Sequence, residues 1–92
     1  MITAIAFVKA DVARIPEVAS AIADIDGVSE VYSVTGQIDL IAMIRVRRHE
    51  HVAEVVADQV NKVPGVTGTE THIAFRTYSK HDLEAAFSLG LD

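Results

Sequence analysis

Residues 32–44 read Tyr-Ser-Val-Thr-Gly-Gln-Ile-Asp-Leu-Ile-Ala-Met-Ile, and this stretch decides the fold. It is typical of two strands joined by a tight turn, because Gly36 accepts positive φ and Asp39 can cap free amides. The second strand, from Leu40 onward, is apolar at consecutive positions and therefore on both of its faces. In a chain of only 92 residues, such a strand indicates that something, such as a second copy, covers the outer face.

The chain also repeats itself. The alternating set Ile2, Ala4, Ala6 and Val8 matches the later set Leu40, Ala42, Ile44 and Val46. The two sets are 38 residues apart, and the same offset aligns Gly27-Val28 with Gly65-Val66. Each half of the chain therefore reads strand, helix, Gly-Val, strand. Two such units with helical crossovers predict an α+β fold, the ferredoxin-like βαββαβ plait with a four-stranded antiparallel sheet.

The predicted elements follow from this pattern. Strands are expected at 1–9, 28–35, 38–47 and 66–77, and helices at 15–25 and 50–62. Pro16 suits the first turn of the first helix, and Gly27 suits its end. Ser79-x-x-Asp82 resembles a capping box that opens a short C-terminal helix. We therefore expect a domain over residues 1–78 and a helical extension over residues 79–92.

The two sheet faces have different chemistry. The alternating sets that begin at Ile2 and Leu40 are uniformly apolar, and we expect the helices to cover them. The opposite face has an apolar centre with charged ends at Lys9, Arg45 and Arg47, as at a protein interface. We predict a sheet-to-sheet dimer with an interface formed by Ile5, Phe7, Ile41 and Met43. The alternative is a monomer whose C-terminal helix folds over this face.

Composition excludes several classes of function. The net charge of −5 disfavours a surface with many phosphate contacts, and the absence of cysteine excludes disulfides and thiolate metal sites. His49-Glu50-His51 lacks the i, i+4 spacing of a helical metal site, so we expect no metal and no cofactor. We find no catalytic constellation, signal peptide or membrane span, and we expect a cytoplasmic domain with no membrane or nucleic-acid partner.

Three motifs together resemble one known family. Residues 31–42, Pro64-Gly65-Val66 and Thr69-x-Thr71 are similar in order and spacing to the effector-binding domain of Lrp/AsnC transcriptional regulators. The resemblance covers roughly residues 1–77. The family's N-terminal helix-turn-helix has no counterpart here, so the chain resembles the stand-alone members, and DNA binding is not carried over.

The resemblance implies a non-enzymatic module that dimerises, joins into rings that are commonly octameric, and binds a small effector, usually an amino acid, where dimers meet. It also implies a role in transcriptional regulation, including co-assembly with full-length regulators. The implied effector loop is Gly36, Gln37, Ile38 and Asp39, with Tyr32, Val34, Thr69 and Thr71 as wall residues. Asp39 would meet the effector's ammonium group. The alternatives are a small dimeric ferredoxin-like enzyme of the monooxygenase type and an assembly partner that binds no ligand.

Overall fold

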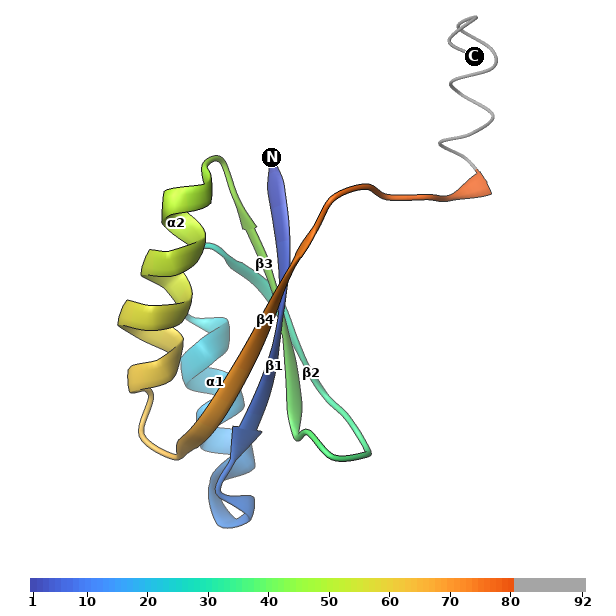
Figure 1. Cartoon of the computed structure of the whole chain (residues 1–92). Helices are drawn as coiled ribbons and strands as arrows, with labels where there is room; N and C mark the ends of the chain where they lie inside the picture. The colour runs from blue at the N-terminus through green and yellow to red at the C-terminus, as the bar shows by residue number, and fades with distance from the viewer. Residues whose placement is uncertain (81–92) are drawn as a thin grey trace, which may run out of the picture.

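The computed structural model, which describes residues 1–80, is a four-stranded antiparallel sheet with helices on one face (Figure 1). The strand order is β2 (Val28–Ser33), β3 (Leu40–Val46), β1 (Ile2–Ala10) and β4 (Val66–Ala74). The two central strands therefore come from the two halves of the repeat. This is the predicted ferredoxin-like plait.

The first crossover consists of a short turn, η1 (Val12–Arg14), and α1 (Ile15–Ala23). The Asp11 carboxylate accepts a hydrogen bond from the N–H of Ala13 at 3.0 Å and so caps η1. Pro16 lies in the first turn of α1, as predicted, where its missing N–H breaks no helical bond. This helix ends two residues earlier than the predicted 15–25, because the chain turns at Asp24 to reach Gly27.

The second crossover is one continuous helix with three kinds of turn. It begins as α2 (His49–Ala53), widens into the π-helical η2 (Glu54–Gln59) and tightens into η3 (Val60–Lys62). Each part buries one valine in the core, Val52 in α2, Val55 in η2 and Val60 in η3, whereas Gln59 is exposed. Apolar periodicity alone predicts a helix here but gives no sign of the π turns. In the described part of the chain, no helix is long and apolar enough to cross a membrane.

The core lies between the helices and the sheet. It includes the repeat-matched positions of β1 and β3 together with Val18 and Ile22 of α1. These strand residues are Ala4, Ala6, Val8, Leu40, Ala42, Ile44 and Val46, all of them buried as predicted. Ile2, the first member of the predicted set, is only partly buried. The small alanines of both strands let the helices approach the sheet closely.

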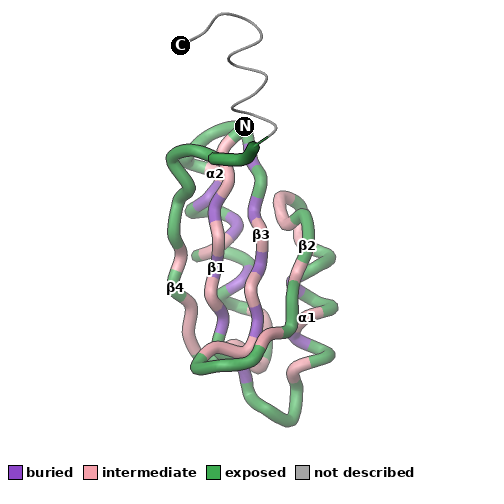
Figure 2. The backbone as a smooth tube through the Cα atoms, turned by 90° about the vertical axis from the view of Figure 1, so that its right-hand side faces the viewer, coloured by how far each residue is buried: buried purple, intermediate pink, exposed green. Residues whose placement is uncertain are grey.

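The opposite face of the sheet carries none of the helices within residues 1–80, and we call it the open face (Figure 2). Strand pairing places Ile5 beside Met43 and Phe7 beside Ile41 at its centre. All four side chains are half-buried within a single protomer, because neighbours on the same face shield one another. The rim is polar and carries, among others, Lys9, Glu30, Arg45, Glu70 and His72.

The last strand is shorter than predicted. It ends at Ala74 instead of residue 77, and residues 75–79 belong to no helix or strand. The C-terminal helix predicted over 79–92 falls on residues 81–92, outside the described residues, apart from its first two positions.

Candidate functional site

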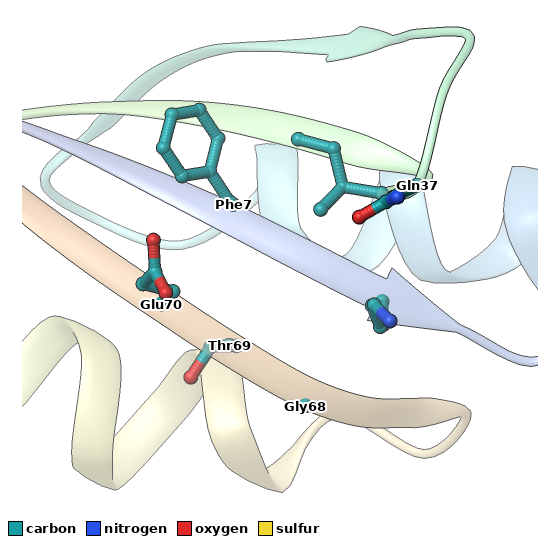
Figure 3. Close-up of a pocket in the computed structure, with 7 residues that line it drawn as sticks. Phe7, Gln37, Gly68, Thr69 and Glu70 are labelled. Atoms are coloured by element: carbon teal, nitrogen blue, oxygen red, sulfur yellow. The ribbon is translucent and has the colours of Figure 1, made fainter.

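A cavity of about 390 Å³ opens on the open face, where the β2–β3 loop meets β1 and β4 (Figure 3). Gln37 and Ile38 line it from the loop, Phe7 and Lys9 from β1, and Gly68, Thr69 and Glu70 from β4. Strand pairing places Phe7 opposite Glu70 and Lys9 opposite Gly68. The lining therefore combines an ammonium group, a carboxylate, an amide and two apolar side chains.

The β2–β3 loop is held against the end of β1 by Asp39. The Asp39 carboxylate Oδ2 accepts a hydrogen bond from the backbone N–H of Ala10 at 2.9 Å. The N–H of Asp39 donates to the carbonyl of Val8 at 3.0 Å, and its carbonyl accepts from the N–H of Val34 at 3.0 Å. Asp39 thus fixes the loop geometry that brings Gln37 and Ile38 to the cavity.

Glycines shape both ends of this site. Gly36 at the exposed tip of the loop has φ of +111°, which L side chains rarely adopt. Gly68 follows an irregularity in pairing, where β4 shifts register against Lys9 and Ala10. Such a bulge redirects the strand locally and is common beside binding sites. Gly68 also adds no side chain to the cavity wall.

The two threonines of the predicted site lie differently. The side chain of Thr69 points away from Phe7 and Glu70 (Figure 3), and its Oγ1 donates to Oδ1 of Asn61 at 2.6 Å. Thr71 lies on the same side of β4 and lines a separate apolar groove with Val52, Val56 and Ile73. Its buried Oγ1 has no hydrogen-bond partner among residues 1–80. Only Thr69 therefore borders the main cavity.

Of the other predicted site residues, Gln37 and Ile38 line the cavity, and Tyr32 and Val34 do not. Tyr32 is exposed on β2 and pairs with Ile41 of β3. Strand β3 therefore lies between Tyr32 and β1, which carries Phe7 and Lys9 of the cavity. A hydrogen bond with Glu30 raises the pKa of the Tyr32 hydroxyl. Tyr32 and Thr71 lie on opposite faces of the sheet, so they cannot border one pocket within a protomer.

Sequence reasoning missed four of the cavity residues, namely Phe7, Lys9, Gly68 and Glu70. Glu70 also contacts His72, with Oε2 at 2.7 Å from Nε2, and the His72 ring packs edge-on to Phe7 at 5.2 Å. The alternation of β1 placed Lys9 on the open face, but only the pairing with β4 brings it near Glu70. Within residues 1–80, no three His, Asp or Glu side chains are grouped so that they could hold a metal ion.

The fold and this cavity together define a class of protein, a small α+β domain. At one end of its sheet it carries an open site that is lined by both polar and apolar side chains. The model of the Lrp/AsnC ligand binding domain matches residues 3–83, and the chain belongs to this family. The chain is 34% identical over 73 residues to the HTH-type transcriptional regulator FL11 of Pyrococcus horikoshii. That match covers 79% of this chain and 48% of the regulator, so the chain spans about half the length of this relative.

Solved structures share this fold. The crystal structure of TTHA0845 from Thermus thermophilus is 40% identical, with a TM-score of 0.82, over 87% of this chain and 100% of that one. A transcriptional regulator of Neisseria meningitidis, solved as a complex with L-Met, is 16% identical with a TM-score of 0.76. That match covers 85% of this chain and 52% of the regulator, and it shows the fold alone.

Proposed function

We propose that this chain is a non-enzymatic module of transcriptional regulation that binds an amino acid with a neutral side chain and assembles around it. The observation that carries the proposal is the lining of the cavity. Lys9 and Glu70 are diagonal neighbours on one face of adjacent strands, with Phe7 and Ile38 beside them. A zwitterion needs one cation and one anion close together, and its side chain needs an apolar surface.

In this proposal, Lys9 binds the carboxylate of the effector and Glu70 binds its ammonium group. Phe7 and Ile38 contact the effector's side chain, and the Gln37 amide supplies a hydrogen bond. Asp39 holds the loop in place, since one of its carboxylate oxygens already accepts from Ala10. The regulator of Neisseria meningitidis that shares this fold was solved with L-Met, which supports an amino acid as the ligand class.

Assembly is the second half of the proposed function. The apolar centre of the open face supports a sheet-to-sheet dimer, and the cavity opens on the same face beside its rim. Any assembly that covers this cavity buries the ligand, so ligand binding favours that assembly over the free dimer. We expect closed rings such as octamers, formed by this chain or together with full-length regulators in the cytoplasm.

Neither catalysis nor direct DNA binding is part of this function. The space between helices and sheet, where a plait enzyme would hold its substrate, is filled by buried Ala, Val, Ile and Leu side chains. The relatives are transcriptional regulators, but the chain's net charge of −5 disfavours contacts with phosphate. We therefore assign DNA recognition to a partner regulator.

The test is titration calorimetry of the full chain against each of the twenty amino acids, paired with native mass spectrometry. Lys9→Met and Glu70→Gln should each weaken binding of a confirmed amino acid by about tenfold or more, because each leaves one charge of the zwitterion unpaired. The matched controls are Lys62→Met and Glu17→Gln, exposed sites outside the cavity. Equal affinity in all four variants would overturn the assignment of the site.

A further inference from the structure

After Ala74 the chain leaves the sheet, and residues 75–79 belong to no helix or strand; together with Lys80 they form a segment that we call the arm. Two large apolar side chains of the arm lie in water, Phe75 at 97% and Tyr78 at 75% exposure. Arg76 and Lys80 make the arm basic, and it contains no acidic residue, in a chain whose net charge is −5. A hydrophobic and basic segment of this kind contributes almost nothing to the core of its own protomer.

The course of the arm indicates what it contacts. It departs on the side of the sheet that faces away from the helices (Figure 1). Seen from the open face, it runs from the end of β4 across the upper ends of β1 and β3 (Figure 2). The arm therefore lies on the same side as the apolar centre formed by Ile5, Phe7, Ile41 and Met43, and not beside the apolar groove that contains Thr71.

We propose that the arm binds a second copy of this chain, with Phe75 and Tyr78 packing against the protomer that covers the open face. Residues 75–79, if fully extended, reach about 17 Å, whereas packed sheets lie about 10 Å apart. The arm is thus long enough to cross the gap between two sheets and lie along the partner. In a two-fold dimer both arms make this contact, so that each protomer holds the other. The inference rests on the sheet-to-sheet dimer of the proposed function.

Charge supports a second copy as the occupant. On the rim of the open face, Glu30 lies on the edge strand β2 and Glu70 on the edge strand β4. The rim also carries Lys9 and Arg45. A partner whose net charge is −5 attracts an arm that carries Arg76 and Lys80. The apolar side chains provide the main stabilisation, because aromatic groups bury the largest area per residue at interfaces.

A tryptophan reporter tests the contact directly, because the chain contains no Trp. In Phe75→Trp, the emission maximum should shift to shorter wavelength as protein concentration rises, in step with the dimer fraction from sedimentation equilibrium. The matched control is Val12→Trp, since Val12 is 80% exposed on η1, at the opposite end of the domain from the arm. An indole at position 75 that stays solvent-exposed in the dimer overturns the proposal. So does a buried signal that persists in the monomer, because it places the arm on its own protomer.

Truncating the two aromatic side chains is the second test. The double variant Phe75→Ala, Tyr78→Ala should raise the dimer dissociation constant by about tenfold or more, and Val12→Ala should leave it unchanged. Because both residues are exposed, circular dichroism should show a normally folded protomer. An unchanged dissociation constant would contradict the arm contact but would not contradict the sheet-to-sheet dimer. A wild-type chain that stays monomeric at micromolar concentration overturns both.

Discussion

The carboxylate of Asp39 binds the backbone N–H of Ala10, with Oδ2 and N at 2.9 Å, and this contact joins the β2–β3 loop to the end of β1. The pairing of β1 with β3 ends at Val8 and Leu40, so the N–H of Ala10, which points to the β3 side, is satisfied by a side chain of the loop. The contact explains why an aspartate stands directly before β3.

Replacing Asp39 should therefore destabilise the domain. We expect Asp39→Ala to lower the free energy of unfolding by about 1–3 kcal/mol, since a part-buried N–H loses a charged acceptor. Asp39→Asn keeps an acceptor oxygen and should cost less. Urea unfolding followed by circular dichroism measures both. If the two variants unfolded like the wild type, the contact would contribute no stability.

Two glycines with nearly equal dihedral angles provide a matched test of packing. Gly65 and Gly36 have φ of +102° and +111°, so alanine is strained at both positions. A Cβ on Gly65 would meet Cγ2 of Val18 at 2.7 Å, whereas a Cβ on Gly36 would meet nothing within 4 Å. Gly65→Ala should therefore cost about 1–3 kcal/mol more than Gly36→Ala in urea unfolding. Equal costs would show that Val18 moves aside freely.

The two threonines of β4 should respond oppositely to valine. Thr71 has a buried hydroxyl without a partner in the described chain, so Thr71→Val removes an unsatisfied polar group and should be neutral or stabilising by up to about 1 kcal/mol. Thr69→Val breaks the bond to Asn61 and should cost about 0.5–1 kcal/mol. Both changes keep a β-branched side chain in the strand. Thermal unfolding of the pair measures the difference, and a marked loss on Thr71→Val would contradict it.

Most of the fold could be predicted from the sequence because its signals are local. Each signal involves only a few neighbouring residues. The strands β1 and β3 are indicated by period-2 alternation, the start of a helix by Pro16, and helix ends by Gly27 and Gly65. The internal repeat then leaves few ways to connect the elements. Strand ends were less predictable, since pairing with β1 and not composition determines where β4 stops.

The site was harder to predict because it depends on register. A shift of one residue exchanges the faces of a strand, and a bulge near Gly68 sets which residues of β4 join Lys9. The loop motif drew attention to Gln37 and Ile38, and both residues line the cavity. Glu70 carried no signal of its own, because an exposed acid on a strand has no distinctive pattern.

The proposed sheet dimer should be sensitive to charge at the centre of the open face. Met43 lies beside Ile5 there, and Met43→Glu would place two carboxylates, one from each protomer, in an apolar interface. We expect the dimer dissociation constant to rise by about a hundredfold or more. Ala21→Glu, on the exposed side of α1, is the control and should leave the dissociation constant unchanged. Sedimentation equilibrium would contradict the interface if both variants dimerised equally.

Alkaline pH should weaken the fold through Tyr32. A hydrogen bond with Glu30 is the main cause that raises the pKa of the Tyr32 hydroxyl above its ordinary value of 10.0. A raised pKa in the folded state means that the native protein holds this proton more tightly than the unfolded chain does. The resulting stability is fully present below pH 10 and is lost as the pH rises through the higher folded pKa.

Removing the Tyr32 hydroxyl separates this contribution from the other alkaline effects on the domain. Tyr32→Phe has no titrating group at this position, so its free energy of unfolding should fall less steeply above pH 10 than that of the wild type. Absorbance at 295 nm in a Tyr78→Phe background isolates Tyr32, since the chain has only two tyrosines. In that background, Glu30→Gln should return the pKa of Tyr32 toward its ordinary value. A Tyr32 pKa that did not respond to Glu30→Gln would assign the shift to the remaining surroundings of the hydroxyl instead.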